Sequence, residues 1–422
     1  MIILLCILFS LGYLAIVLEH PLGINKTATA LLTGIACWVC LAMAGPGPET
    51  ILPELSHHLS GIAEILFFLL GAMTIVEVID SHYGFRKITG FIRSKSPLRL
   101  LWIISWAAFF FSALLDNLTT AIVMASITRK MVSDKTWRLY IVSMVVIAAN
   151  AGGAWSPIGD VTTTMLWVGG QIETMSIIKT VFLPSVISLL VPLLLVSFLL
   201  RNKGLELAEE KEQAAFPAGA AAVLLFGLGG LLMVPVFKNL THLPPYLGIL
   251  LVLGLVWVLT ELIHQKKSQE EKSVYTPSHA LTRIDTPSIL FFLGILLAVS
   301  ALESAHLLRD AAQWLDGFTG NKSLIMCLIG LASAVVDNVP LVAAAMGMYD
   351  LSAFPGGHAM WTELAFAAGT GGSILIIGSA AGVAVMGIEK IDFLWYLKKI
   401  AGLALAGFLA GYAVLELMLS QG

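Results

Sequence analysis

The sequence contains few charged residues. Only 12% of its 422 residues are charged and 58% are hydrophobic, whereas a soluble domain carries roughly 25% charged residues. The mean hydropathy is +0.90. Apolar stretches of about 20 residues, each long enough to cross a hydrocarbon core, recur along the whole chain. These features exclude a soluble globular protein and indicate an all-α polytopic membrane protein, inserted in the lipid bilayer.

The chain also lacks a cysteine framework and any block of like charge. Its four cysteines are all in apolar segments, and the single Cys37-x-x-Cys40 pair has no second pair or histidine to complete a zinc site. The net charge is −3, which predicts no nucleic-acid partner. No cofactor is expected. The first ten residues, MIILLCILFS, have no basic region or cleavage site and are predicted to be a retained helix.

Twelve apolar segments organise the chain. Two of them, 137–170 and 361–388, are predicted to be crossing helices that are broken by NAGGAWSPIGD and GTGGS. Two more, 98–130 and 322–350, are predicted to be re-entrant hairpins. The remaining segments are predicted to be uninterrupted spans, at 2–18, 27–44, 61–80, 177–200, 217–236, 244–263, 287–305 and 395–419.

Positive charges favour a hairpin over a simple span at 98–130, because basic residues flank both of its ends and those residues prefer the cytoplasm. The flanking residues are Arg86, Lys87, Arg93, Lys95, Arg99, Arg129, Lys130, Lys135 and Arg138. The same argument places Lys26 inside. It predicts ten crossings with both termini external, a cytoplasmic-side first hairpin and an external-side second hairpin.

Two inverted repeats follow from this arrangement. Residues 1–212 are predicted to form the first repeat and 213–422 the second, each with about five spans and one hairpin. SALLDNLTTAIVM at 112–124 resembles SAVVDNVPLVAAAM at 333–346, at an offset of 221 residues. Inverted repeats with interrupted helices are typical of secondary transporters, and the interruptions indicate the binding site.

Paired Asp-Asn sequences at the hairpin tips carry the chemistry. An ionisable side chain at the bilayer centre costs about 2.5–3.5 kcal/mol, so these aspartates need compensation. A small cation would supply it, because hard cations prefer carboxylate, amide, hydroxyl and carbonyl oxygens. The alternative is that each aspartate only caps the half-helix that follows. The tip residues are Asp116, Asn117, Asp337 and Asn338, with Ser112, Thr119, Thr120 and Ser333 around them.

The broken helices add further oxygen ligands. Glycine and proline in the first one free backbone carbonyls beside Asn150, Ser156, Asp160 and Thr163. Asp160 could also act only as a helix cap. The second supplies Thr370, Ser373 and Ser379 but no carboxylate. Sodium is therefore predicted to bind the set Asp116, Asn117, Asn150, Asp160, Asp337 and Asn338, while Glu64 in the third span is a candidate access or pH-sensing carboxylate.

The paired Asp-Asn tips, the Asn-Ala-Gly-Gly segment and the following Ser-Pro-x-Gly-Asp resemble the NhaD-type sodium/proton antiporters of the ion transporter superfamily. The resemblance covers essentially the whole chain. It implies exchange of sodium, or lithium, for protons, a homodimer, elevator-like movement, a bacterial inner-membrane location and a role in pH homeostasis. It also implies that the tip and broken-helix residues lie in or near the ion path. Carboxylate transporters of the superfamily usually carry a Ser-Asn-Thr signature at the tips, and Asp in its place favours cations.

The predicted mechanism is exchange at shared carboxylates. An aspartate in a desolvated pocket holds a proton when no cation is bound and releases it when a cation arrives. An arsenite or dicarboxylate transporter is the first alternative, but it would need Arg or Lys near the hairpins, and none lies within the tips. A cation channel is the second. An intramembrane aspartyl protease using Asp116 and Asp160 is a remote third, and the mirrored Asp337 argues against an enzyme.

Overall fold

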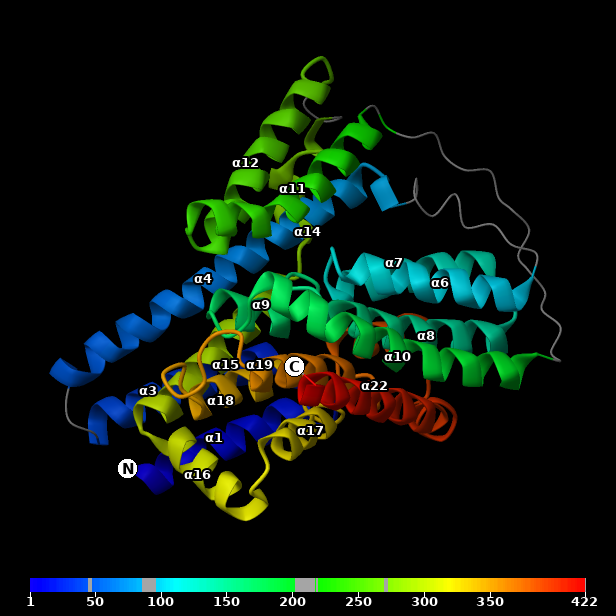
Figure 1. The fold of residues 1–422 in the computed structure, drawn as a ribbon. Coiled ribbons are helices and arrows are strands. Elements are labelled where there is room, and N and C mark those ends of the chain that lie inside the picture. The colour runs from blue at the N-terminus through cyan, green and yellow to red at the C-terminus, as the bar shows by residue number, and fades with distance from the viewer. Residues whose placement is uncertain (45–47, 86–95, 202–216, 218, 269–271, 422) are drawn as a thin grey trace.

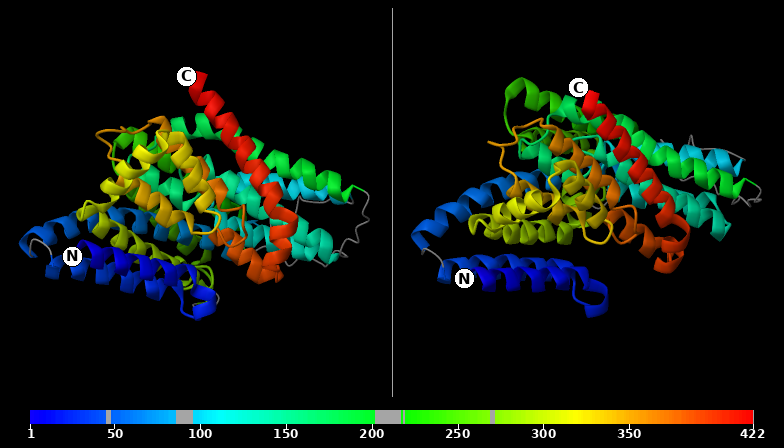
Figure 2. Two further views of the ribbon diagram at one scale, coloured as in Figure 1. Left: turned by 90° about the horizontal axis from the view of Figure 1, so that it is seen from below. Right: turned by 60° about the horizontal axis from the view of Figure 1, so that its bottom comes forward.

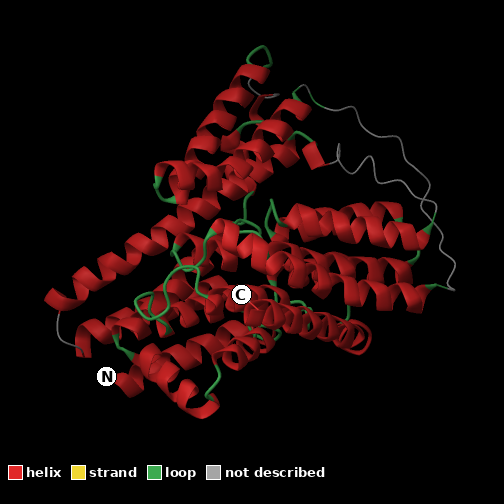
Figure 3. Cartoon of the chain, viewed as in Figure 1, coloured by secondary structure: helices red, strands yellow, loops and turns green. Residues whose placement is uncertain are grey.

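The structure is a computed structural model (Figure 1) that describes residues 1–421 apart from 45–47, 86–95, 202–216, 218 and 269–271. The described residues form helices and connecting loops, with no strand among them (Figure 3). Within this part of the chain, eight helical stretches are long and apolar enough to cross a membrane. They are Lys26–Met43, Glu49–Ser81, Lys135–Ala154, Thr174–Leu200, Ala220–Thr241, Pro245–His264, Thr286–Ser304 and Phe393–Gln421. The prediction of an all-helical polytopic membrane protein is confirmed.

Each predicted uninterrupted span coincides with a helix, but one boundary is wrong. The span predicted at 61–80 belongs to α4, which runs from Pro48 to Ser81 and is about 51 Å long at 1.5 Å per residue. Its early turns stay helical because Ile51 is buried in an apolar cluster and Leu55 packs against that cluster, and such packing outweighs the low helix propensity of Gly61. The other helices are α1 (Ile2–Val17), α3 (Lys26–Ala44), α10 (Thr174–Leu200), α11 (Ala220–Thr241), α12 (Pro245–His264), α15 (Thr286–Ser304) and α22 (Gly402–Gln421).

Both hairpins and both broken helices are present. The first hairpin is α6 (Pro97–Ser112) and α7 (Asn117–Met131), and the second is α17 (Lys322–Ala332) and α18 (Asn338–Met348). The first broken helix is α8 (Lys135–Ala154) followed by α9 (Val161–Val168), and the second is α19 (Ala359–Gly371) followed by α20 (Ala380–Glu389). Turns at 155–160 and 372–379 separate the two parts of each broken helix, so each second part begins with backbone N–H groups that have no partner within the helix.

Helix contacts recur in mirrored pairs. The first arm of each hairpin packs on the broken helix of its own half, α6 on α8 and α17 on α19. The second arm packs on the other half, α7 on α20 and α18 on α9. Likewise α3 packs on α15 and α12 on α4, while α10 packs on α22. This exchange of partners supports the two predicted repeats, although their boundary at 212–213 stays a prediction because residues 202–216 lie outside the described part, as do Arg86, Lys87, Arg93 and Lys95.

Two groups of helices can be distinguished by these contacts. We define the scaffold group as α1, α3, α4, α11, α12 and α15, and the hairpin group as α6 to α10 together with α17 to α22. Helices α15 and α18, and helices α4 and α9, touch across the boundary. Figure 2 shows the N-terminal helices of the scaffold group along one side of the molecule, with the C-terminal helix on another.

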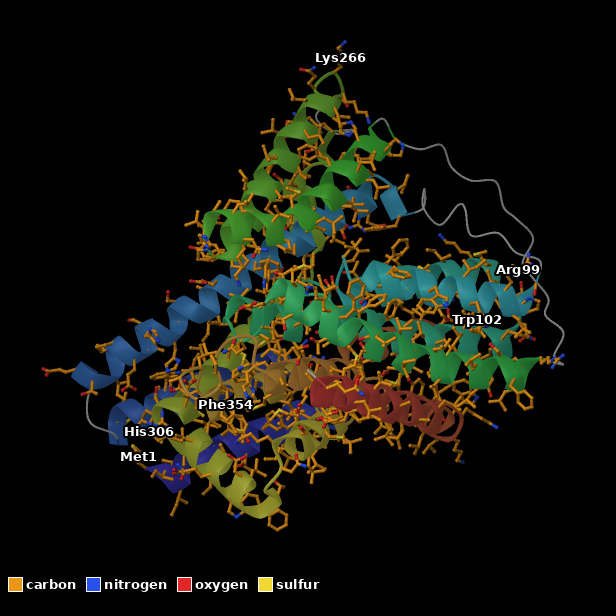
Figure 4. All side chains as sticks on the ribbon, viewed as in Figure 1. Met1, Arg99, Trp102, Lys266, His306 and Phe354 are labelled. Atoms are coloured by element: carbon orange, nitrogen blue, oxygen red, sulfur yellow. The ribbon has the colours of Figure 1, made fainter. Side chains whose placement is uncertain are left out.

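Short helices complete the chain. α16 (Leu307–Thr319) links α15 to the second hairpin, α14 (Pro277–Arg283) precedes α15, α2 (Glu19–Leu22) precedes α3, and α21 (Phe393–Tyr396) leads through a π-helical turn into α22. Charged residues such as Arg99, near the start of α6, and Lys266, after α12, lie at the periphery of the molecule (Figure 4). The hairpin tips are therefore placed toward the interior, at the other end of α6 from Arg99.

Candidate ion-binding site

Four half-helices begin at the centre of the hairpin group, and each has a polar N-cap. Asp116 caps α7, Asp160 caps α9, Asp337 caps α18 and Ser379 caps α20, each by accepting a hydrogen bond from a backbone N–H of the first turn. The capping alternative is thus correct as local structure. It does not compete with ion binding, because an ionised carboxylate has two oxygens with about four acceptor positions and a cap uses one of them.

Buried amides join these N-termini. Asn117 Nδ2 donates to Asn150 Oδ1 at 3.1 Å and to Asp160 Oδ2 at 2.9 Å. Asn150 Nδ2 donates in turn to Ser379 Oγ at 3.0 Å. Asn150 is fully buried and Asp160 is 2% exposed. The network connects α7, α8, α9 and α20, so it ties both halves of the chain together at the break in each crossing helix.

Asp160 lies between two small cavities. Each has a volume of about 30 Å³, room for about two water-sized spheres. The first contains Asp116 and Asp160 and is otherwise walled mainly by apolar residues of α4 and the first hairpin. The second contains Asn117, Asp160, Asp337 and Asn338. The structure therefore brings the three predicted aspartates around adjoining spaces, with Asp160 shared by both.

The two hairpin aspartates have different partners. Asp116 accepts two hydrogen bonds from Thr119, from its backbone N and from Oγ1, both at 2.7 Å. Asp337 Oδ1 accepts from the backbone N of Val339 at 3.2 Å, while its Oδ2 faces the ammonium of Lys26 at 3.2 Å. Asn338 is 5% exposed, and its Nδ2 has no protein partner. Of the two Asp-Asn pairs, the second is therefore the one whose amide Nδ2 has no protein partner.

Sequence reasoning missed Lys26 as a site residue. No basic residue lies within either tip, yet folding places Lys26, the first residue of α3, in the second cavity beside Asp337. Its Nζ also lies 4.6 Å from the centre of the Phe291 ring. Ser379 was visible in the sequence but was not assigned to the site. Its signal is its place at the break of the second crossing helix, equivalent to that of Asp160 in the first.

Hydroxyl groups hold each hairpin against its broken helix. Ser112 Oγ donates to the carbonyl of Ala149 at 2.6 Å, and Ser333 Oγ donates to the carbonyl of Ala368 at 3.2 Å. Ser156 Oγ donates to Ala113 O at 2.5 Å. These bonds occupy the hydroxyl protons in local structure. The role of these serines in the ion path stays a prediction.

The other predicted hydroxyls lie close to the same breaks. Thr163 Oγ1 donates to Asp160 O at 2.9 Å, Thr370 Oγ1 to Phe366 O at 2.6 Å, and Ser373 Oγ to Thr370 O at 2.6 Å. Thr120 is fully buried, and its Oγ1 has no protein partner. Of these four hydroxyls, only that of Thr120 is free of a protein hydrogen bond and so available to a ligand.

Glycines allow the close packing of hairpin and broken helix. A Cβ at Gly152 would lie 2.1 Å from the carbonyl oxygen of Phe109, and one at Gly371 would lie 2.0 Å from that of Gly330. These are equivalent contacts in the two halves, between α8 and α6 and between α19 and α17. Only a residue without a side chain permits this approach, which sets the position of both tips.

Glu64 lies apart from these residues. It is half-buried near the middle of α4, where the nearby charge is that of Lys238, and it does not line either of the two cavities described above. Its role in access or pH sensing stays a prediction. Among the described residues, no group of three or more His, Cys, Asp or Glu side chains could hold a metal ion, so a cation here would depend on amide and carbonyl oxygens as well as carboxylates.

Comparison with known proteins agrees with this geometry. Residues 13–371 match the family of citrate transporters. The chain is 51% identical to sodium/proton antiporter 1 of Arabidopsis thaliana, over 97% of this chain and 71% of that protein. It is 30% identical to the Na⁺/H⁺ antiporter NhaD of Vibrio cholerae, over 93% of this chain and 87% of that protein. The chain belongs to the NhaD family. The resemblance seen in the hairpin tips is therefore confirmed.

Membership of the NhaD family makes this chain a transporter and not an enzyme, and the eight apolar helices agree with a multi-pass membrane protein. The crystal structure of the YdaH transporter of Alcanivorax borkumensis superposes with a TM-score of 0.60, over 94% of this chain and 98% of that one. Sequence identity to it is 13%, so this likeness concerns the fold alone. The two chains therefore share their overall helical fold.

Proposed function

We propose that the protein exchanges sodium for protons by alternating access at Asp116, Asp160 and Asp337. The observation that carries the proposal is the junction of four half-helix N-termini, where three aspartates and Asn117 line two small cavities and Asn117 donates a hydrogen bond to Asn150. The names of the relatives in Arabidopsis thaliana and Vibrio cholerae support the same exchange. Lithium is proposed as a second cargo.

Charge balance explains why one site can serve both ions. Three carboxylates and one ammonium line the two cavities, so the site carries two net negative charges when all four groups are ionised. Uncompensated charge at membrane depth is unfavourable by several kcal/mol. Protons and a sodium ion both carry the positive charge that offsets this cost. The carboxylates and the ammonium titrate as a coupled set. Binding one ion therefore expels the other, which is the requirement for exchange.

Movement of the hairpin group past the scaffold group is the proposed route of alternating access. All three aspartates and the three asparagines, Asn117, Asn150 and Asn338, belong to the hairpin group, so the site can travel as a unit. The scaffold group contributes Lys26, Phe291 and the apolar face of α4 to the cavity walls. A homodimer, a bacterial inner-membrane location and a role in pH homeostasis complete the proposal. Relatives at 51% and 49% identity come from a plant, Arabidopsis thaliana.

A vesicle assay tests the exchange. Everted membrane vesicles from cells without their own antiporters are given an acid-inside pH gradient, and sodium, lithium or potassium chloride is added. Sodium should collapse the gradient in vesicles with the protein and leave it intact in vesicles without it. Failure of every cation to collapse the gradient would overturn the proposal.

Transport of a carboxylate anion is the second candidate. The family model that matches this chain is described as that of citrate transporters. Helix N-termini favour anions, and Lys26 supplies a positive charge beside the second tip. Three aspartates at the same junction argue against it, because they would repel the substrate. Uptake of labelled citrate into the same vesicles separates the two, since an exchanger of cations should take up none above the background of control vesicles.

A further inference from the structure

We propose that Lys26 is an internal counter-cation that competes with the transported cation for Asp337. The inference rests on the proposed function and adds a residue to it from the scaffold group. Lys26 Nζ lies 3.2 Å from Asp337 Oδ2, in the same cavity as Asn117, Asp160 and Asn338. Its ammonium thus occupies the oxygen of Asp337 that the helix cap does not use.

The surroundings of Lys26 hold the ammonium without enclosing it. The side chains of Lys26 and Asp337 are 28% and 19% exposed, so a cation arriving through water can reach the carboxylate. The Phe291 ring lies under the ammonium at 4.6 Å, a contact that favours a cation. An ion pair of this exposure is a weak competitor, one that a transported cation can displace.

Two other carboxylates can pair with the displaced ammonium. Glu19 and Asp285 both attract the Lys26 charge electrostatically, and Glu19 Oε1 accepts the backbone N–H of Lys26 at 3.1 Å. When a cation takes Asp337, Lys26 can turn toward these carboxylates at the end of the scaffold group. The positive charge then need not be left unpaired.

The fold does not require this pair. Helix α12 occupies the place of α3 in the mirrored set of contacts, and its first residue is Pro245, which carries no charge. Asp116, the mirrored carboxylate, accepts two hydrogen bonds from Thr119 of its own hairpin. An ion pair with a purely structural role would be expected at both tips. Its presence at one tip points to a role in the chemistry of Asp337.

The pair also crosses between the two groups of helices. Lys26 belongs to α3 in the scaffold group, and Asp337 belongs to the tip of the second hairpin. Displacement of the ammonium by a cation therefore removes a contact between the groups at the moment when the site is loaded. Lys26 thereby couples occupancy of the site to release of the hairpin group.

Sodium-dependent thermal stabilisation of the purified full-length protein measures this competition directly, because a ligand of the folded state raises its stability as the site fills. The pH and the ionic strength are fixed, with choline chloride replacing sodium chloride. In Lys26→Met, which keeps the straight apolar stem, half-maximal stabilisation should need about tenfold less sodium, the change that about 1.4 kcal/mol of lost competition gives. Lys26→Arg should stay within about twofold of wild type.

Lys322→Met is the matched control. Lys322 is also the first residue of a helix, pairs with Asp316 at 2.7 Å and lies 4.9 Å from the Tyr349 ring, but it lies outside the two cavities. Its sodium dependence should match wild type. Unchanged or weakened sodium binding in Lys26→Met, or equal shifts in Lys26→Met and Lys26→Arg, would overturn the inference.

The two proposals fail in different ways. If wild type shows neither sodium-dependent stabilisation nor exchange, the proposed function is wrong and the inference falls with it. If wild type responds to sodium and Lys26→Met behaves like Lys322→Met, only the inference is wrong. Should Lys26→Met not fold, Lys26→Gln serves as the neutral variant, and the same tenfold gain in sodium affinity is expected.

Discussion

The approach of α8 to α6 at Gly152 gives the most demanding prediction. A Cβ at this position would meet the Phe109 carbonyl oxygen at 2.1 Å, whereas ordinary contact begins at 3.4 Å, so the two helices must move apart by about 1.3 Å. Overpacking of this kind costs about 1–3 kcal/mol. Alanine would otherwise favour the helix by about 1 kcal/mol over glycine, and the packing term should exceed that gain.

The expected loss of function is larger than the loss of stability. Asn150 lies two residues before Gly152, and its bond with Asn117 is 3.1 Å long. A separation of about 1 Å takes such a bond beyond the ~3.5 Å at which it ceases to count. Misplacement by about 1 Å can cost about 100-fold in rate. We therefore expect Gly152→Ala to lower the initial rate of sodium/proton exchange by about 100-fold and to lower the melting temperature.

Gly387→Ala is the matched control for this prediction. Gly387 lies inside α20, and a Cβ there would meet nothing within 4 Å. The same substitution should leave exchange unchanged and raise stability slightly. Equal rates and equal melting temperatures for Gly152→Ala and Gly387→Ala would refute the claim that glycine at the α6–α8 contact positions the first hairpin tip.

Three further results are expected. Asn150→Ala should weaken sodium binding at least tenfold in the stabilisation assay, because it leaves the buried amide of Asn117 with one partner fewer, while Ser143→Ala on the same helix should not. Burial lowers the pKa of the His82 ring below its ordinary value of 6.5, so the folded state binds fewer protons than the unfolded state. Stability should therefore fall as pH drops below about 6.5. Melting curves from pH 8 to 5 should show a smaller fall in melting temperature for His82→Gln than for wild type, and the same fall as wild type for His242→Gln. Lys238→Met should lower the melting temperature, because Lys238 Nζ donates to the Trp167 carbonyl at the end of α9 at 2.7 Å, and an unchanged melting curve would contradict this role.

Much of the fold could be predicted because the chain repeats its own signals. Basic residues at both ends of 98–130 indicated the first hairpin, and the offset of 221 residues between the two Asp-Asn tips agreed with a second hairpin in the corresponding place. The start of α4 could not be predicted. Ser60 and Gly61 weaken the helix locally, and the tertiary packing of Ile51 and Leu55 in an apolar cluster extends it back to Pro48.

The candidate site shows the same division between local and distant information. Asp116, Asp160 and Asp337 were found because a carboxylate in an apolar segment is costly wherever it lies. Lys26 was missed because its role depends on a contact with Asp337, 311 residues away along the chain. A lysine at the start of a span has an ordinary explanation in membrane topology, and only the packing of α3 on α15 brings it to the second tip.

The central claim is that Asp160 is the shared carboxylate of a sodium/proton exchanger. The most direct test is uptake of radioactive sodium into proteoliposomes under an imposed pH gradient, comparing wild type with Asp160→Asn and with Asp316→Asn, whose carboxylate pairs with Lys322 outside the two cavities. The account predicts proton-driven sodium uptake in wild type and in Asp316→Asn, and none above protein-free liposomes in Asp160→Asn. Undiminished uptake in Asp160→Asn would contradict it.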